Sequence, residues 1–392
     1  MRLAIAGKID PSRIIKAFDL QLIGSTKSAP ETSSLRTPKQ NITNIALELH
    51  ESVQYLDMVT FHPAATKPLK FLGDKSRLTL LPYRSRARQR AKDYFKAERT
   101  LIRNHINDSD IEIINAHHTY EYSLGSMQTA IPVLITVHDW APKILSLMPD
   151  KYRVLRMAMQ VHCLLKAKHL VSVSPYIDQK IRSWYKKESV IIPNPLGTEW
   201  FKSVDHSARK PFIIAVNNGS GKLKNVITLV YAFQKIRKHF PHYEMILLGT
   251  GYENDGEFAG NVKRGGLGDG IHFKGNINNE ELIGEYDQAS IMVHPSREES
   301  FGIVIAEAMA RNLPVLGGIR SGAVPWVIGD SRCLVDINDV NQLAEKIIEL
   351  IEDQDRLEEI GRGLRGRAEE KFQIGAVADA YYQLLKTILE SR

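Results

Sequence analysis

Short apolar runs rich in β-branched residues recur along the chain, and amphipathic segments with helical periodicity fill the intervals between them. This alternation is typical of β–α units, which build a parallel sheet with helices on its faces. The pattern predicts strands in the first half at residues 3–7, 57–62, 112–118, 132–139, 170–174 and 190–194. It predicts strands in the second half at residues 212–218, 245–249, 271–275, 290–296, 314–318 and 333–336. We therefore expect an α/β protein with two doubly wound sheets.

The length of the chain, 392 residues, exceeds the usual size of a single hydrophobic core and indicates two domains. Residues 194–210 combine turn-forming residues with no clear periodicity, as a hinge linker would. We expect a first domain at residues 1–200, a second at 201–373, and a C-terminal helix within 374–392 that packs back on the first. A ligand would bind in the cleft faced by the carboxyl ends of the strands in both sheets. Residues 23–44, rich in Ser, Thr and Pro, are expected to form a mobile loop.

Charge is shared unevenly between the two halves. Residues 1–200 contain 29 Lys and Arg against 18 Asp and Glu, a net charge of +11, which leaves −4 for residues 201–392. The first half is therefore the one that would seek an anionic surface. The only cysteines, Cys163 and Cys333, lie in separate apolar segments, which favours a reducing compartment over a disulfide framework. Because no apolar stretch reaches the roughly 18 residues of a membrane span, we expect a cytoplasmic protein.

Two carboxylates flank the turn that follows the strand predicted at 290–296. Glu299 lies in the loop, and Gly302 permits a tight backbone turn before a helix that would begin near Ile303. Glu307 would lie about one turn into that helix, roughly 6 Å along its axis. The free N–H groups at a helix start form a natural site for phosphate oxygens. The two acids would therefore contact different parts of one elongated ligand.

Glu307 lies among small and apolar residues, where an unpaired carboxylate would be costly. Two kinds of partner are open. Arg311, four residues further on, would form a favourable ion pair within the helix. Alternatively, a pair of vicinal hydroxyls, such as those of a ribose, could donate hydrogen bonds to the carboxylate.

The segment PSREESFGIVIAEAMARNLPVLGG (295–318) resembles the E-x7-E signature of the retaining, GT-B-fold glycosyltransferases of family 4. Further stretches similar to that family lie at residues 134–139, 190–201, 247–253 and 271–296, although Pro195 replaces a usual glycine. The resemblance covers most of the second half and scattered strands of the first. It implies the GT-B fold, with two Rossmann-like domains that face each other across a cleft.

The resemblance also implies roles for individual residues around the two glutamates. Glu299 would hydrogen-bond hydroxyls of the transferred sugar, and Glu307 would bind the ribose. Backbone donors to the sugar and the diphosphate would come from Ser300, Phe301, Gly302 and Ile303. The backbone at Gly275 and Asn276 would bind the base, and uracil and guanine both remain open.

A Gly-rich loop with lysines, AVNNGSGKLKN (215–225), follows the first strand of the second half and precedes a predicted helix. Such a loop suits a departing diphosphate, whose developing negative charge needs preorganised cations, although solvated lysines before a capped helix would look similar. Lys224 aligns with the phosphate lysine of the family, and Asn218 and Gly219 would also contact the donor. The family usually places an arginine at the position of Gly219, so Lys222 and Arg297 are alternative second cations.

His138 ends an apolar strand, where a lone histidine is more often structural, and the resemblance gives it a role in binding the donor sugar next to the acceptor. Asp139 could orient its ring or cap the next turn. His117 and His118 end the neighbouring strand, but no third ligand at suitable spacing accompanies them, which disfavours a metal site. Family members often have a Gly-Gly loop near the acceptor after the first strand, whereas this chain has only Gly7 there.

Two expectations concern cofactors and partners. No Asp-x-Asp pair lies in the loops where a metal-dependent transferase would need one, so we expect no metal and no cofactor beyond the nucleotide-sugar substrate. Residues 83–105 would form a helix with six basic side chains within about 120° of one face: Arg84, Arg88, Lys92, Lys96, Arg99 and Arg103. Such faces are mostly solvated, but this one could attach a transferase peripherally to an anionic membrane. Nucleic acid is not expected, because the chain has no recognisable DNA- or RNA-binding module.

These expectations converge on a retaining enzyme that moves a hexose or N-acetylhexosamine from a UDP- or GDP-sugar to a glycan or lipid-linked acceptor. The product would be a cell-surface polysaccharide or glycolipid. No side chain is placed as a covalent nucleophile, so the front-face mechanism proposed for the family is favoured. Two alternatives stay open: another enzyme on the same fold, such as a nucleotide-sugar epimerase or a phosphorylase, and a catalytically silent nucleotide-sugar-binding subunit, which Gly219 leaves possible.

Overall fold

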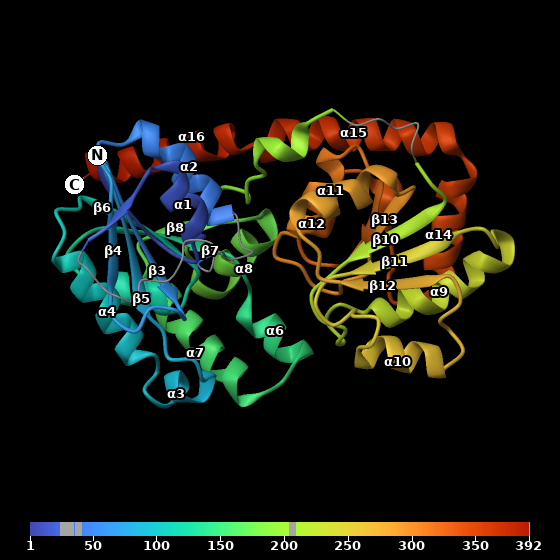
Figure 1. The fold of residues 1–392 in the computed structure, drawn as a ribbon, viewed down its shortest axis with the longest axis horizontal. Helices are drawn as coiled ribbons and strands as arrows, with labels where there is room; N and C mark the ends of the chain where they lie inside the picture. The colour runs from blue at the N-terminus through green and yellow to red at the C-terminus, as the bar shows by residue number, and fades with distance from the viewer. Residues whose placement is uncertain (24–34, 36–40, 204–208, 392) are drawn as a thin grey trace. The chain divides into compact units, whose positions relative to one another are not determined.

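The computed structural model describes residues 1–23, 35, 41–203 and 209–391 (Figure 1). The chain divides into two compact units. The first unit comprises Met1–Pro195 and Ile374–Arg392, and the second unit comprises Leu196–Gln373. Each unit has its own sheet, and Figure 1 shows helices on both sides of each one. Most of the loop expected at residues 23–44 lies outside the described residues.

In the described part of the first unit, nine strands form one sheet in the order β2-β4-β5-β3-β1-β6-β7-β8-β9. They are β1 (Arg2–Ala6), β2 (Gln21–Leu22), β3 (Tyr55–His62), β4 (Leu69–Leu72), β5 (Ser76–Pro82), β6 (Ile113–His117), β7 (Val133–Val137), β8 (His169–Ser172) and β9 (Val190–Ile191). The six strands predicted from the sequence are all present and parallel, whereas β2, β4 and β5 were not predicted. Of these three, β4 pairs antiparallel with both β2 and β5.

The helices of the first unit are α1 (Pro11–Ala17), α2 (Asn41–Ser52), α3 (Ala87–Lys92), α4 (Lys96–Asn107), α5 (Glu121–Ser126), α6 (Ala141–Leu147), α7 (Lys151–Lys166), α8 (Pro175–Tyr185) and α16 (Ile374–Glu390). The C-terminal helix α16 packs against α2, and its apolar side chains join the core of the sheet. The Tyr381 hydroxyl lies 3.1 Å from that of Thr136 on β7, so a buried hydrogen bond also joins α16 to the sheet.

The second unit contains, in its described part, a parallel six-stranded sheet in the order β12-β11-β10-β13-β14-β15. Its strands are β10 (Phe212–Val216), β11 (Glu244–Leu248), β12 (Ile271–Gly275), β13 (Ile291–His294), β14 (Val315–Gly318) and β15 (Leu334–Val335), at the six predicted places. Its helices are α9 (Val226–His239), α10 (Glu257–Arg264), α11 (Asn279–Gln288), α12 (Ile303–Ala310), α13 (Val324–Ile328), α14 (Val340–Glu352) and α15 (Gln354–Phe372), with the 3-10 helix η2 (Thr198–Phe201) before them.

The strand order reverses direction between β10 and β13, which are hydrogen-bonded neighbours. All five residues of β10 are buried and apolar, as expected of a central parallel strand covered on both faces. At such a reversal the two following loops diverge to opposite faces of the sheet, and ligands bind in the crevice between them. The loops after β10 and β13 are those in which Lys224 and Glu299 lie.

The expectation of one basic helix at residues 83–105 is wrong. The stretch forms two helices, α3 and α4, and between them Tyr94 and Phe95 have left-handed backbone angles, φ 54° and 58°. The side chain of Phe95 is fully buried, so packing of this ring accounts for a break that no glycine or proline signals. Arg84 lies before α3, where its guanidinium group forms ion pairs with Asp93 and Glu98. A continuous cationic face therefore does not exist here.

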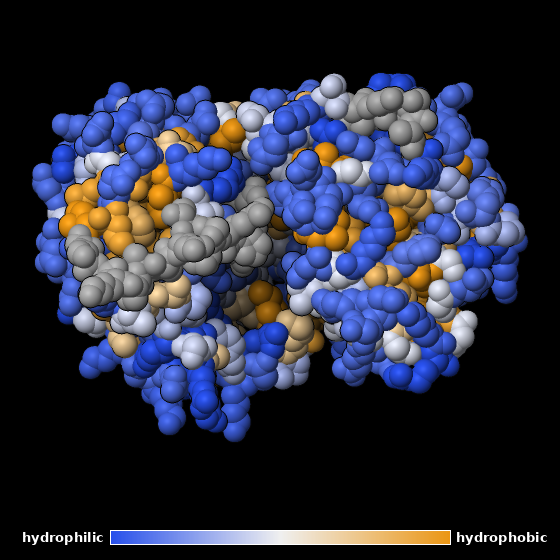
Figure 2. All heavy atoms as spheres, in the orientation of Figure 1, coloured by the Kyte–Doolittle hydropathy of each residue, from blue (hydrophilic) through white to orange (hydrophobic). Residues whose placement is uncertain are grey.

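Hydrophilic residues cover most of the described surface on the face shown in Figure 2. None of the helices formed by the described residues is long and apolar enough to cross a membrane. Cys163 and Cys333 are both buried free thiols.

Candidate active site

Lys224 and Glu299 meet at the carboxyl edge of the second unit's sheet. The Lys224 ammonium group donates a hydrogen bond of 2.5 Å to Oε1 of Glu299. The same oxygen lies 3.1 Å from Nε2 of His294, the last residue of β13, which is 1% exposed. Burial alone would raise the pKa of Glu299, but the charge of Lys224 and the hydrogen bond and charge of His294 outweigh it. The pKa therefore lies well below its usual value, and Glu299 is a carboxylate at neutral pH.

The sequence did not single out His294, although it lies five residues before Glu299. Its only signal was its place at the carboxyl end of a strand, where site residues of parallel sheets gather.

Arg297 lies in the loop after β13 that also carries Glu299, and it holds the Gly-rich loop after β10 in place. The backbone N–H of Arg297 donates to the carbonyl oxygen of Leu223 at 2.9 Å, and its guanidinium group donates to the carbonyl oxygen of Lys222 at 3.2 Å. A further hydrogen bond of 2.7 Å joins Arg297 to Asn338. Arg297 is thus engaged in bracing the loop that carries Lys224. Lys222 itself is exposed to solvent.

Gly219 has φ +91°, a conformation that an L side chain rarely adopts, although open space surrounds the position of a Cβ. Its N–H donates to the carbonyl oxygen of Thr250 at 2.8 Å, and the N–H of Thr250 donates to Oδ1 of Asn218 at 3.1 Å. The Thr250 hydroxyl in turn accepts from the side chain of Asn276 at 2.8 Å. Thr250 thereby connects Asn218 and Gly219, predicted to contact the donor, with Asn276, predicted to bind the base. The sequence did not reveal this role of Thr250.

The helix α12 begins directly after Gly302, whose φ of +85° makes the tight turn that the sequence predicted. The N–H groups of Ile303 and Val304 donate no hydrogen bond to any described residue, as is usual at a helix start. Ser300, just before them, is half-buried. Phe301 is only 2% exposed, and its ring packs on Trp326 and Phe372, so only the backbone of Phe301 can serve a ligand.

Glu307 is half-buried on α12, and among the described residues nothing forms a hydrogen bond or ion pair with its carboxylate. Burial, together with the nearby charge of Glu199 in η2, raises its pKa to about 8. The predicted alternative of an ion pair with Arg311 is wrong. The Arg311 guanidinium instead forms an ion pair of 2.7 Å with Asp287 on α11 and donates to the carbonyl oxygen of Trp200. Arg311 thus secures η2 and α11, and Glu307 is left for another partner.

In the first unit, the histidines at the ends of β6 and β7 lie together. Nδ1 of His117 is 2.9 Å from Nε2 of His138, and the rings of His118 and His138 are 4.5 Å apart. Burial and the proximity of His138 lower the pKa of His117 well below its usual value, so His117 is neutral. Gly7 lies against the same group, since a Cβ there would come within 3.3 Å of Cβ of His117 and 2.9 Å of Ile42. Because β1, β6 and β7 are neighbours in the sheet, Gly7 after β1, His117 at the end of β6 and His138 after β7 lie close together.

Asp139 neither caps α6 nor forms a hydrogen bond with the ring of His138. Its Oδ1 accepts from the Tyr120 hydroxyl at 2.7 Å and from Gln160 at 3.2 Å. A pocket of about 220 Å³ adjoins it, lined by Tyr120, Asp139, Ala141, Ile144, Tyr152, Arg153 and Arg156. The Arg156 guanidinium lies 3.3 Å from the centre of the Tyr120 ring and is paired with Glu121. Aromatic faces, a carboxylate and guanidinium groups are a combination that suits a polar, hydroxylated ligand.

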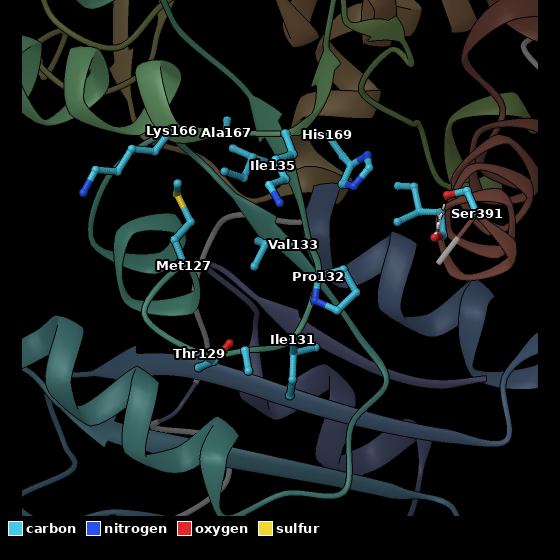
Figure 3. A pocket seen from close by; sticks show the side chains of 13 residues that line it. Met127, Thr129, Ile131, Pro132, Val133, Ile135, Lys166, Ala167, His169 and Ser391 are labelled. Carbon is cyan, nitrogen blue, oxygen red and sulfur yellow. Dashed lines mark hydrogen bonds between the residues drawn. The ribbon is translucent and has the colours of Figure 1, made fainter.

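A pocket of about 470 Å³ lies at the opposite, amino-terminal edge of β7 and β8 (Figure 3). Its walls include Val133 and Ile135 of β7, His169 of β8 and Ser391 near the end of the chain. None of the residues that line it was predicted as a site residue. Among the residues that the structure describes, no group of three or more His, Cys, Asp and Glu side chains is arranged to hold a metal ion.

Comparisons with known proteins identify the family and the fold of the chain. Residues 197–367 match the family model described as glycosyl transferases group 1, and residues 42–200 match the model described as glycosyltransferase family 4. A solved structure of sucrose-phosphate synthase from Thermosynechococcus elongatus matches with a TM-score of 0.79 and 21% identity, and the match covers 100% of both chains. At this identity the likeness establishes the fold, which is GT-B. The chain belongs to the GT-B glycosyltransferases of family 4.

Two curated relatives of this glycosyltransferase differ in how much they share with it. It is 24% identical to the N-acetyl-alpha-D-glucosaminyl L-malate synthase of Bacillus anthracis over 305 residues, which are 71% of this chain and 76% of the relative. It is 30% identical to the MMP alpha-(1->4)-mannosyltransferase of Mycolicibacterium hassiacum over 191 residues, which are 48% of this chain and 46% of the relative. The chain thus spans less than half the length of the second relative.

Proposed function

We propose that this glycosyltransferase is a retaining enzyme that moves a hexose or N-acetylhexosamine from a UDP- or GDP-sugar to a glycan or lipid-linked acceptor. The names of the two relatives, an N-acetylglucosaminyl and a mannosyl transferase, support that range of sugars. The observation that carries the proposal is the contrast across the turn from Glu299 to Glu307. One carboxylate is already ionised beside a lysine, and the other is half-buried and has no hydrogen-bond or ion-pair partner among the described residues.

The nucleotide would lie across the start of α12. Its diphosphate would receive hydrogen bonds from the N–H groups of Ile303 and Val304 and from the ammonium group of Lys224. Glu307, one turn further along α12, would accept hydrogen bonds from the two ribose hydroxyls. The base would lie towards Gly275 and Asn276, which Thr250 ties to the Gly-rich loop.

Glu299 would bind hydroxyls of the transferred sugar through Oε2, which has no hydrogen-bond partner among the described residues, because Oε1 is already shared by Lys224 and His294. As the bond between the sugar and the diphosphate breaks, negative charge grows on the leaving phosphate, and Lys224 stabilises it without the need for water to reorganise. The leaving phosphate would take the proton of the acceptor hydroxyl, which then attacks the sugar from the same face. This path keeps the anomeric configuration of the donor.

The acceptor would bind at the first unit, where Gly7, His117 and His138 gather at the carboxyl edge of the sheet. The pocket beside Asp139, with Tyr120, Tyr152 and Arg153, is the proposed site for its hydroxylated part. Peripheral attachment to a membrane is not part of the proposal, because the basic stretch that suggested it is interrupted between α3 and α4.

Calorimetric titration of the purified protein with UDP and GDP tests the donor class. The proposal expects one of the two to bind with micromolar to submillimolar affinity, and binding of neither would contradict it. Nuclear magnetic resonance of the glycoside product then tests retention: an anomeric configuration equal to that of the donor sugar supports it, and an inverted configuration contradicts it.

Product release by the purified protein, measured with and without an acceptor, distinguishes the proposal from an epimerase and from a silent subunit. An epimerase would release free sugar and nucleoside diphosphate, or a changed sugar, without any acceptor at rates that an acceptor does not increase. A silent subunit would bind the nucleotide but show no acceptor-dependent release of UDP or GDP. The expected result is release that rises with the acceptor concentration.

A further inference from the structure

His294 has a place in the second unit that the proposed mechanism does not yet use. The ring ends β13 and is 1% exposed, with Nε2 at 3.1 Å from Oε1 of Glu299. A carboxylate can only accept a hydrogen bond, so the hydrogen lies on Nε2 and His294 is the donor. Its Nδ1 is buried and forms no hydrogen bond with any described residue. The contact with Glu299 is therefore the one hydrogen bond that the structure records for this ring among the described residues.

The two oxygens of Glu299 have different surroundings. Oε1 is shared by Lys224 and His294, whereas Oε2 has no hydrogen-bond partner among the described residues. The backbone of Glu299 is fixed as well, because its carbonyl oxygen accepts from the N–H of Ala323 at 2.8 Å. An anchored Oε1 leaves Oε2 with a defined direction, as binding a particular hydroxyl requires.

The two donors to Oε1 differ in what a nucleotide would do to them. Lys224 has a flexible side chain, and a diphosphate would compete with Glu299 for its single charge. His294 is fixed by its strand and by burial, and it cannot follow a phosphate. When a nucleotide-sugar binds, His294 is thus the donor that stays with Glu299.

We propose that His294 is a positioning residue, which holds the Glu299 carboxylate in place for the transferred sugar while Lys224 turns to the diphosphate. The proposal rests on the proposed function, in which Glu299 binds the sugar. It assigns His294 no contact with the substrate. Binding of the nucleotide alone should therefore not depend on His294, whereas turnover should.

Two substitutions separate the role of the ring nitrogen from that of the ring as packing. In His294→Gln, the amide nitrogen reaches about as far along the side chain as Nε2 and can donate to Glu299. In His294→Asn, the amide ends at the place of Nδ1 and falls short. Turnover is measured as release of nucleoside diphosphate from UDP-N-acetylglucosamine and from GDP-mannose, using the donor that binds.

The expected result is a loss of turnover of about 10- to 100-fold in His294→Asn, the usual worth of a hydrogen bond to a charged group. His294→Gln should stay within about 3-fold of the natural protein, and both variants should bind UDP or GDP within about 3-fold. His105→Asn is a matched control. Nε2 of His105 lies 3.0 Å from Asp57, so this variant removes a buried histidine–carboxylate pair in the first unit. It should lower stability but leave turnover unchanged.

Equal turnover in the folded Asn and Gln variants would overturn the proposal, whether both are active or both inactive. Glu299→Ala separates this outcome from failure of the proposed function. If Glu299→Ala keeps turnover, the proposed function fails, and the role of His294 fails with it. If Glu299→Ala loses turnover while His294→Asn keeps it, only the role of His294 is wrong. In the Glu299→Ala background, His294→Asn should cause no further loss, and a further loss would show that His294 acts independently of Glu299.

Discussion

The loop that carries Glu299 and the helix that carries Glu307 each contain a glutamate, and the surroundings of the two carboxylates have opposite effects on their pKa values. Glu299 is held by Lys224 and His294, and its pKa lies well below the usual value despite burial. Glu307 has no such partner among the described residues, and burial with the nearby Glu199 raises its pKa to about 8. The protein thus ionises one carboxylate in advance and leaves the other dependent on what binds.

This contrast explains how a single turn can serve both ends of a nucleotide-sugar. A preionised, oriented carboxylate is useful where charge develops during the reaction, because it need not reorganise. A carboxylate that awaits donors is useful for binding, because hydroxyls that arrive with the ligand satisfy a group that burial has made unstable. Glu299 is therefore expected to affect turnover, and Glu307 to affect nucleotide affinity.

Removal of the preionised carboxylate should give the largest effect. In Glu299→Ala, turnover should fall by about 100-fold or more, because the hydroxyls of the sugar lose their acceptor during the reaction. UDP or GDP should bind at least as tightly as before, since Lys224 loses its competing partner. Steady-state kinetics and calorimetry measure the two quantities, with exposed Glu257→Ala as the control. Loss of nucleotide affinity with unchanged turnover would reverse the assignment of the two acids.

Removal of the Lys224 charge should give the second largest effect, on nucleotide affinity. In Lys224→Met, the dissociation constant for UDP or GDP should rise by about 10- to 100-fold, because the diphosphate loses a charge-assisted hydrogen bond. Lys222→Met is the matched control in the same loop, and it should change the affinity by less than about 3-fold. If Lys222→Met has the larger effect, Lys222 rather than Lys224 serves the diphosphate.

The raised pKa of Glu307 predicts a pH-dependent affinity. Below its pKa of about 8, Glu307 is protonated and must lose a proton before it accepts from both ribose hydroxyls, so binding should strengthen with rising pH. The affinity for UDP or GDP should rise by up to about tenfold from pH 7 to pH 8 and level off above. Calorimetry in buffers of different ionisation enthalpy should detect the released proton. Glu307→Gln should show neither effect, and an equal slope in both proteins would contradict the role of Glu307.

The stability of the protein should also depend on Glu307, with the smallest consequence for its activity. Since the folded-state pKa of Glu307 lies above its unfolded value, its contribution is fully present below the unfolded pKa and is lost as the pH rises through about 8. Glu307→Gln removes this loss. From pH 5 to pH 8.5, the free energy of unfolding of Glu307→Gln should therefore rise by up to about 4 kcal/mol relative to that of the natural protein. Urea titration at each pH measures the difference, and a difference that does not change with pH would contradict the assigned pKa shift.

The sequence predicted the architecture better than the details at its edges. Buried parallel strands are mostly continuous apolar runs, and the strands of the second unit were recognised as short apolar stretches, although β12 alternates buried and exposed residues. The strands β2, β4 and β5 were not predicted. They have two, four and seven residues, and short strands carry little periodic signal. The break between α3 and α4 was not predicted either, because burial of Phe95 overrides a strong local preference for helix.

For the candidate site, the sequence indicated which segments would lie close together but not which side chains pair. Spacing alone made Arg311 a plausible partner of Glu307, but Asp287 on another helix takes it. Thr250 was overlooked because its contact with Asn276 joins two loops that only the pairing of β11 and β12 brings together. His294 was overlooked because spacing alone does not show that the loop after β13 turns Glu299 back towards it. The left-handed turn at Gly302 was predictable, since glycine adopts that conformation readily.

A crystal structure of the protein with bound UDP or GDP tests the central claim most directly. The account predicts that the Glu307 carboxylate lies within about 3.2 Å of both ribose hydroxyls, with the diphosphate at the start of α12 beside Lys224. A nucleotide bound elsewhere, with Glu307 contacting only its own chain, would contradict it.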